Sequence, residues 1–308
     1  MNAIENERLK VTFRYAPGEK VYHRFETIGV MAEVLLDGKD VFTEPEQLDA
    51  GRFSCQGVGL CGEYVWDGLG AEARKGEWYP KFGVGLIEQN EDNKPYDMWD
   101  ASYQYTLFPV TAQFFEDRAV FTQEPIPCRG YAARIVKEIA LSGSQIRSTT
   151  TVENCGEKPL HMAEYQHNFV AVNHQVIGPD YELEVPFNRE LGKLEGSVSS
   201  LKTREKVPDV LAVEGGKMVW KRSMGEGLTL FHRFEQEALA CGEKSFWTLR
   251  NKKHGLSITE EFDFVPSVLV QWGIEHCVCT EVYAPIEANP GESCRFTRTW
   301  RLKRERGE

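Results

Sequence analysis

The chain has 308 residues, 41% of them hydrophobic, which is enough to bury a sizeable core as one large domain. Its formal net charge is −11. Lys and Arg are scattered among the acidic residues and form no basic stripe, which argues against nucleic acid and anionic lipid as partners. We therefore expect neither of these partners.

Targeting signals and cysteines indicate the compartment in which the protein is expected to lie. The segment MNAIENERLKVTFRY lacks the features of a signal peptide, and no run approaches the ~20 apolar residues that cross a bilayer. We expect a cytoplasmic protein. Its eight cysteines are thinly spread and are predicted to be reduced: Cys55, Cys61, Cys128, Cys155, Cys241, Cys277, Cys279 and Cys294. Cys277 and Cys279 lack a second Cys/His pair at zinc-site spacing, which favours buried structural cysteines.

Alternation of apolar and polar residues predicts strands throughout the chain, and helical periodicity is nearly absent. The clearest predicted strands are bounded by turn residues and cover Ala132–Leu141, Gln145–Val152, Met218–Lys221, Leu228–Phe234, Ser245–Leu249, Leu256–Phe262, Ser267–Trp272 and Arg295–Leu302. Three segments are ambiguous between loop and short helix, namely Glu116–Ala119, Leu191–Pro208 and Glu235–Ala240. We predict antiparallel sheets packed as a sandwich, within one domain spanning residues 1–308.

Several well-known catalytic motifs are missing. The sequence contains no G-x-x-x-x-G-K-[ST], G-x-S-x-G or H-E-x-x-H, and the Gly-rich segment Gly57–Leu60 lacks a strand–turn–helix setting. Nucleotide hydrolysis, serine esterase and zinc protease chemistry therefore lose their main support. What remains is a set of His, Glu and aromatic residues on predicted strands, which is a typical composition for a sugar site.

Two segments concentrate these residues. In HMAEYQHNFVAVNHQVIGPDYELEVPF, strand alternation places rings and imidazoles on one face, at His161, Tyr165, His167 and Phe169. The opposite face carries Glu164, Gln166 and Asn168. In QWGIEHCVCTEVYAPIEANPGES, Glu281 follows an apolar alternating run that is expected to desolvate it partly.

The order of these motifs resembles the aldose 1-epimerase, or galactose mutarotase-like, superfamily. A strand pair ending TTVENCGEKPL leads to His167-Asn168-Phe169, and VCTE ending at Glu281 precedes NPGES and the last strand RFTRTWRL. The ordering spans roughly residues 20 to 303. The early L-H-G-G segment of galactose mutarotases is replaced by GVGLCGEYVWDG, and the CVCTEV stretch is similar to the hexose-6-phosphate-epimerase side of the superfamily.

The resemblance implies an all-β, antiparallel β-supersandwich that interconverts the anomers of a free aldose or aldose phosphate. It implies that Glu281 is the general base and His167 the general acid, with no metal or cofactor. The alternatives are a non-catalytic carbohydrate-binding protein of the same fold, and a sugar lyase or hydrolase, for which the sequence offers no clear second acid.

Four further residues are candidates for substrate binding. Glu63, in GLCGEY, is predicted either to hold a sugar hydroxyl or to end a strand. Arg52 and Lys81 are expected to face an anionic or hydroxyl-rich ligand, although isolated basic residues are usually solvated. Trp272 is expected to stack on a sugar face or to pack in the core.

Overall fold

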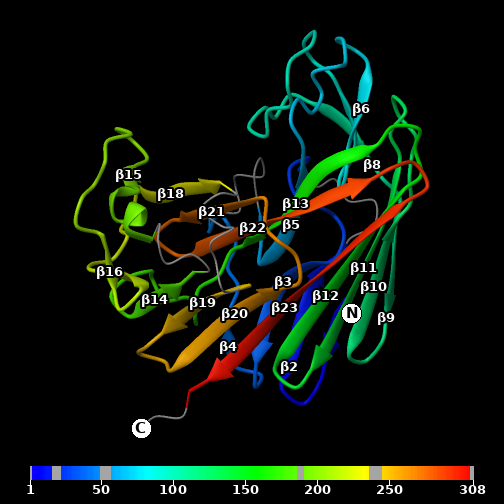
Figure 1. Ribbon diagram of the computed structural model, residues 1–308. Coiled ribbons are helices and arrows are strands. Elements are labelled where there is room, and N and C mark those ends of the chain that lie inside the picture. The colour runs from blue at the N-terminus through cyan, green and yellow to red at the C-terminus, as the bar shows by residue number, and fades with distance from the viewer. Residues whose placement is uncertain (1, 16–21, 49–56, 186–190, 236–244, 306–308) are drawn as a thin grey trace.

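Two large antiparallel sheets make up most of the chain in Figure 1. The computed structural model describes residues 2–15, 22–48, 57–185, 191–235 and 245–305. The first sheet runs, in spatial order, β1 (Ala3–Glu5), β2 (Leu9–Arg14), β3 (Val30–Leu36), β5 (Leu60–Val65), β13 (Leu160–Asn168), β22 (Val278–Ala288), β21 (Val268–Gly273), β18 (Leu228–Glu235) and β15 (Val198–Ser200), with β4 (Asp40–Val41) paired to β3.

The second sheet packs face to face with the first. In spatial order it comprises β16 (Leu211–Glu214), β17 (Lys217–Trp220), β14 (Tyr181–Glu184), β19 (Phe246–Asn251), β20 (Leu256–Phe262), β23 (Ser293–Arg304), β12 (Gln145–Asn154), β11 (Ala133–Ser142), β10 (Arg118–Gln123) and β9 (Val110–Phe114). One hydrophobic core includes strand residues of both sheets, such as Ile139 and Trp300 from the second and Val34 and Ile286 from the first. The predicted fold class, an antiparallel β-sandwich, is confirmed.

Every strand predicted from alternation corresponds to an observed strand whose ends lie within two residues of the prediction. The ambiguous segment Leu191–Pro208 holds a short 3-10 helix, η2 (Leu191–Gly196), followed by β15. Glu116–Ala119 contains the start of β10 at Arg118. The prediction for Glu235–Ala240 falls almost entirely outside the described residues.

The Gly-rich segment that precedes β5 makes a close backbone approach. Gly59 has a φ of +61°, and a Cβ at this position would lie 2.0 Å from the carbonyl oxygen of Met31. Only glycine is compatible with both constraints. The segment therefore sets the start of β5 against β3.

A third, three-stranded sheet stands at the top of the view in Figure 1 and comprises β6 (Trp78–Lys81), β7 (Gly85–Glu88) and β8 (Gln104–Leu107). Buried His23 ties it to the body, because its ring nitrogens contact the Tyr96 hydroxyl at 2.8 Å and the Asp100 carbonyl at 3.0 Å. Burial lowers the pKa of His23. This contact fixes the segment that carries the next residue, Arg24.

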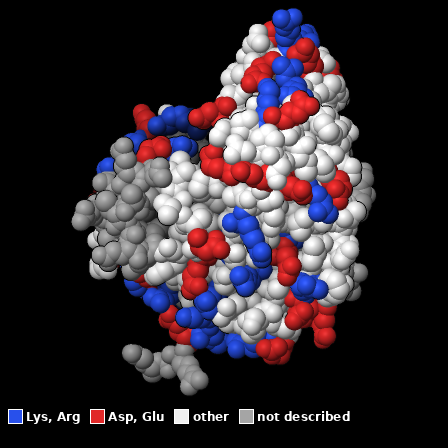
Figure 2. Space-filling model, turned by 45° about the vertical axis from the view of Figure 1, so that its right-hand side comes forward, with Lys and Arg blue, Asp and Glu red and all other residues white. Residues whose placement is uncertain are grey.

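On the face shown in Figure 2, Lys and Arg are interspersed with Asp and Glu, and no continuous basic patch is visible. No helix among the described residues has the length and apolar character needed to span a membrane. The described cysteines, namely Cys61, Cys128, Cys155, Cys277, Cys279 and Cys294, are all free thiols.

Candidate active site

A tight turn places β13 beside β22. In the segment Asn154–Pro159, the buried Asn154 amide donates 2.9 Å hydrogen bonds to the carbonyls of Lys158 and Ala288, and its oxygen accepts from the Gly156 N–H at 2.9 Å. Asn side chains favour such local backbone bonds in turns. The register of β13 on β22 begins at Leu160–Ala288 and is therefore fixed by this turn.

His167 on β13 and Glu281 on β22 meet on one face of the first sheet. The His167 Nε2 and Glu281 Oε1 atoms are 3.0 Å apart. His167 is 2% exposed and Glu281 5% exposed. An imidazole and a carboxylate this close, and this well removed from water, form a potential acid–base pair.

The strand ladder is interrupted where this pair sits. β13 and β22 are paired up to Tyr165–Tyr283, and the pairing resumes at Val170–Val278 in the same register. Within the gap, the Thr280 carbonyl accepts from Asn168 Nδ2 at 3.1 Å. The Val282 carbonyl accepts from a guanidinium nitrogen of Arg298 at 2.8 Å. Side-chain donors thus replace the missing backbone bonds and satisfy buried carbonyls.

Those donors belong to a polar network buried between the two sheets. Arg298 from β23 pairs with Glu164 and Glu260 at 2.7 Å each. Lys137 from β11 pairs with Glu26 at 2.5 Å. Burial raises the pKa of Glu26 and of Glu260, although Lys137 and Arg298 respectively oppose the shift. We call these five residues the inter-sheet charge network.

The predicted two faces of β13 are confirmed. Glu164, Gln166 and Asn168 point between the sheets, where all three are buried and hydrogen-bonded. Tyr165 and His167 lie on the other face with Glu281. The inter-sheet charge network as a whole was not predicted from the sequence. Alternation within ARIVKEIAL and RFTRTWRL was the available signal, because it places Lys137 and Arg298 among inward-facing residues.

Aromatic rings surround the imidazole of His167. Phe169 stacks on it with a centroid distance of 4.1 Å, and the edges of Phe25 and Trp272 approach it at 5.6 and 5.4 Å. Trp272 is partly exposed and lies opposite Cys279 in the β21–β22 register, so it is on the same face as the acid–base pair. Trp272 therefore both packs against the site and presents a ring edge beside it.

Glu63 lies on the same face, one strand away from β13, opposite Tyr165. It accepts hydrogen bonds from Lys81 Nζ at 3.0 Å, from Arg24 Nε at 3.2 Å and from the Tyr165 hydroxyl. Burial raises the pKa of Glu63, but Lys81, Arg24 and the Tyr165 hydroxyl outweigh it and hold that pKa below its ordinary value. Glu63 is therefore an ionised, fixed carboxylate.

Lys81 is fully buried and has no exposed surface. Its ammonium also donates to the Tyr64 carbonyl at 2.7 Å. This geometry turns the Lys81 ammonium toward Glu63 and the backbone. Lys81 was predicted to face an anionic or hydroxyl-rich ligand directly, and this arrangement does not support that prediction.

Sequence reasoning missed Arg24 and Trp99. Arg24 contacts Glu46 at 3.4 Å, and its guanidinium lies 5.3 Å from the Trp99 ring centroid. Trp99 is 63% exposed, so the charged cluster around Glu63 reaches the surface beside an aromatic ring. Neither residue lies in a recognisable motif. A buried arginine in the segment before β3 gives no periodic signal.

The remaining candidates lie apart from the acid–base pair or beyond the described chain. Arg52 falls outside the described residues. His161 and His174 have largely exposed side chains and pair with Glu287 and Glu44, respectively. No group of three or more His, Cys, Asp or Glu side chains in the described ranges is arranged to hold a metal ion.

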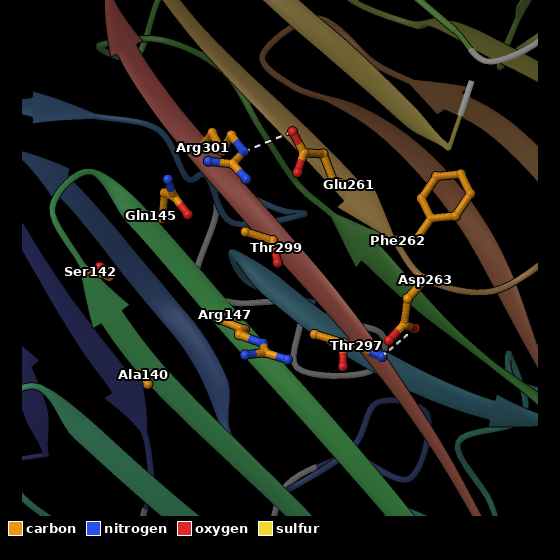
Figure 3. Close-up of a pocket in the computed structure, with 10 residues that line it drawn as sticks. All are labelled: Ala140, Ser142, Gln145, Arg147, Glu261, Phe262, Asp263, Thr297, Thr299 and Arg301. Atoms are coloured by element: carbon orange, nitrogen blue, oxygen red, sulfur yellow. Dashed lines mark hydrogen bonds and ion pairs between the residues drawn. The ribbon is translucent and has the colours of Figure 1, made fainter. Parts of the chain in front are cut away.

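A separate groove of about 520 Å³ lies on the outer face of the second sheet (Figure 3). Its charged side chains are largely engaged within the sheet: Arg301 pairs with Glu261 at 2.7 Å, and Asp263 accepts from the Thr297 N–H at 2.7 Å. Thr297 and Thr299 form part of its floor. The groove has the features of a solvated sheet face, and it contains no acid–base pair comparable to His167–Glu281.

Comparisons with known proteins define the fold. No family model matches the sequence, and no curated protein matches it significantly. A provisionally assigned aldose 1-epimerase from Escherichia coli K12 is 12% identical with a TM-score of 0.59, over 98% of each chain. A galactose mutarotase-like protein from Lactobacillus casei ATCC 334 is 16% identical with a TM-score of 0.54, over 98% of this chain and 99% of its own.

A galactose mutarotase related enzyme from Lactobacillus acidophilus is 10% identical with a TM-score of 0.54, over 98% of this chain and 96% of its own. The chain therefore has the galactose mutarotase-like fold along nearly its whole length. The resemblance drawn from the order of the sequence motifs is confirmed at the level of fold. At these identities the likeness does not extend to activity.

Proposed function

We propose that the protein is an aldose 1-epimerase-like isomerase that interconverts the anomers of a free aldose or aldose phosphate. The observation that carries this proposal is the 3.0 Å contact between His167 Nε2 and Glu281 Oε1. The pair is nearly buried, lies on one sheet face and has aromatic rings and a fixed carboxylate beside it. The residues proposed as acid, base and sugar-binding groups thus lie close to one another, which supports the proposal.

The proposed reaction starts with His167 protonated and Glu281 ionised. A bound sugar replaces the direct contact between the two side chains. Glu281 takes the proton of the anomeric hydroxyl while His167 Nε2–H protonates the ring oxygen, and the bond between the anomeric carbon and the ring oxygen breaks. The open aldehyde rotates about its neighbouring carbon–carbon bond. Reversal of both proton transfers then closes the other anomer and restores both side chains.

The other groups on this face bind and orient the sugar in the proposed complex. Glu63 accepts hydrogen bonds from sugar hydroxyls, and Lys81 with Arg24 keeps it ionised for that purpose. Trp272 provides apolar contact for a sugar C–H edge. Trp99 extends the aromatic surface at the exposed rim near Arg24.

The main alternative is a carbohydrate-binding protein of the same fold that does not catalyse anomer exchange. A glycoside hydrolase is less well supported. Such an enzyme needs a second carboxyl group that carries a proton. Among the described residues, Glu63 is a second carboxyl group on the same face as Glu281, and its cationic partners hold its pKa low, so it lacks the proton that a general acid donates.

The test is NMR exchange spectroscopy at neutral pH on a panel of aldoses and their 6-phosphates, with wild-type protein and His167→Asn. The proposal predicts faster anomer exchange for at least one sugar, and loss of that acceleration in His167→Asn with sugar binding retained. Sugar-dependent line broadening without faster exchange would support the binding-protein alternative. Which sugars respond would decide between free and phosphorylated substrates.

A further inference from the structure

Phe231 on β18 continues the aromatic residues of the candidate site away from His167. In the register of β18 on β21, Phe231 lies directly opposite Trp272. Directly opposed residues on neighbouring strands point to the same face of a sheet. Trp272 lies on the face of the acid–base pair, with its ring centroid 5.4 Å from that of His167. Phe231 is therefore on the same face, in the spatial order β22, β21, β18 (Figure 1).

The burial pattern of β18 agrees with this orientation. Leu230 and Phe234 are buried in the core between the sheets, whereas Phe231 is 55% exposed. Residues two apart on a strand share a face, so Arg233 and Glu235 lie on the face of Phe231. These two form a largely exposed ion pair at 2.7 Å. The outer face of β18 thus presents an apolar ring next to a guanidinium and a carboxylate.

Arg233 lies in line with the proposed base. It is opposite Val270 on β21, and Val270 is opposite Glu281 on β22. Because neighbouring strands are about 4.8 Å apart, Phe231 and Arg233 lie roughly 10 Å from β22 across the sheet. A single aldose held between His167 and Glu281 is too short to reach β18. The second ring of a disaccharide whose reducing end is held there extends that far.

The surroundings of Phe231 indicate the chemistry of a ligand. A lone exposed apolar residue on a protein surface needs no ligand. Phe231 instead adjoins Trp272, which itself lies beside His167. An aromatic ring accompanied by a few donor and acceptor groups suits a pyranose, because the ring contacts the C–H face and the polar groups contact the hydroxyls.

We propose that Phe231 and Arg233, together with Trp272, form a second sugar subsite, so that the substrate is the reducing end of an oligosaccharide. This inference rests on the proposed anomer exchange and names the substrate class of that site. The reducing sugar lies at His167 and Glu281, and the glycosidic bond passes Trp272 and stays intact. The next ring lies against Phe231, and the Arg233 guanidinium donates hydrogen bonds to its hydroxyls.

The test compares the best-bound aldose with disaccharides that carry this aldose at their reducing end, such as maltose, cellobiose, lactose and isomaltose for glucose. NMR titration gives the dissociation constants, and NMR exchange spectroscopy gives kcat/KM for anomer exchange. Both are measured on wild type, Phe231→Ala, Arg233→Gln and Phe115→Ala. Phe115 is the matched control, because it is also an exposed ring and follows β9 at the edge of the second sheet.

In wild type we expect at least one disaccharide to bind about two- to tenfold more tightly than the aldose alone, which is the gain from one aromatic contact. Phe231→Ala is expected to lose this gain and to keep the affinity for the aldose, because the Phe231 ring lies outside the core. Arg233→Gln is expected to lose part of the gain. Phe115→Ala is expected to match wild type.

The dissociation constants separate this inference from the proposed function, because they need no turnover. Equal wild-type affinities for the aldose and every disaccharide, or a gain that Phe231→Ala keeps, would overturn the subsite. A gain that Arg233→Gln keeps in full would remove Arg233 from it. Anomer exchange with the same kcat/KM for the aldose and every disaccharide would also count against the subsite alone. A gain that depends on Phe231 without any anomer exchange would overturn only the proposed function.

Discussion

The two faces of β13 are both polar, yet they differ in how their groups are satisfied. Between the sheets, Glu164 accepts a hydrogen bond from Arg298. Asn168 donates a hydrogen bond to Glu260 and accepts one from the Trp300 indole. On the site face, the ring nitrogens of His167 contact only a carboxylate and a thiol among the described residues.

The two faces of β13 therefore differ in role: the inter-sheet face holds the strand in place, and the other face carries the residues of the proposed reaction. The inter-sheet charge network has internal partners for each of its charged groups, so it fixes β13 and spans the gap in the β13–β22 ladder. In the proposed reaction, a bound sugar replaces the direct contact between His167 and Glu281 on the site face. A well-satisfied buried network makes the strand rigid, whereas the few partners of the His167 ring nitrogens leave them free to act in the proposed reaction.

The largest expected effect on stability comes from breaking the inter-sheet charge network. Arg298→Met removes the partner of Glu164 and Glu260, and uncompensated buried charge costs about 3–5 kcal/mol in the free energy of unfolding. Urea denaturation measures it. Arg301→Met is the control on the same strand, because its pair with Glu261 is partly exposed and is worth less than about 1 kcal/mol. Equal losses in both variants would show that the inter-sheet charge network stabilises the fold no more than a partly exposed ion pair.

A smaller effect is expected from Glu63→Gln, with a defined pH dependence. The folded-state pKa of Glu63 lies below the unfolded value of about 4.3, so its stabilisation is present above that pH and is lost as the pH falls through the folded pKa. We expect a loss of about 1–3 kcal/mol at pH 7, because the variant leaves the buried Lys81 and Arg24 side chains without their carboxylate partner.

Unfolding free energies of wild type and Glu63→Gln, measured from pH 7 to pH 3, check this prediction. The difference between the two proteins is expected to shrink as the pH falls below about 4. A difference that stays constant with pH would show that the carboxylate charge contributes nothing.

The smallest effect is expected at Trp272, one of the aromatic rings beside His167. Trp272→Leu keeps an apolar side chain but removes the ring, and aromatic contacts of this kind contribute about 0.5–1.5 kcal/mol. We expect the sugar dissociation constant to rise roughly two- to tenfold in a titration followed by NMR or fluorescence. Phe115→Leu, at an exposed ring following β9, is expected to leave affinity unchanged. Equal affinities in wild type and Trp272→Leu would remove Trp272 from the binding surface.

Strand positions were predictable from the sequence because alternation is a local signal. The same signal placed His167 and Glu164 on opposite faces of β13 correctly. The pairing of strands distant in the chain, such as β13 with β22, was not predicted, because no local pattern specifies it. The resemblance indicated the class of fold, which periodicity alone could not.

The parts that the sequence did not predict depend on contacts between distant segments. Arg24 reaches Glu63 from the irregular stretch before β3, and Lys81 reaches the same carboxylate from the small third sheet. Lys81 was expected to face a ligand, and its burial beneath Glu63 could not be read from its surroundings in YPKFGVGL. The interruption of the β13–β22 ladder likewise needs the Arg298 and Asn168 side chains, which come from separate strands.

Glu281 is the proposed base for anomer exchange. The most direct measurement is the exchange rate of the best aldose, by NMR exchange spectroscopy, with wild type, Glu281→Gln and Glu261→Gln, a control on the outer face of the second sheet. We predict a loss of about 10²–10⁴-fold in Glu281→Gln with sugar binding retained, and the wild-type rate in Glu261→Gln. Anomer exchange by Glu281→Gln at the wild-type rate would show that Glu281 is not the base.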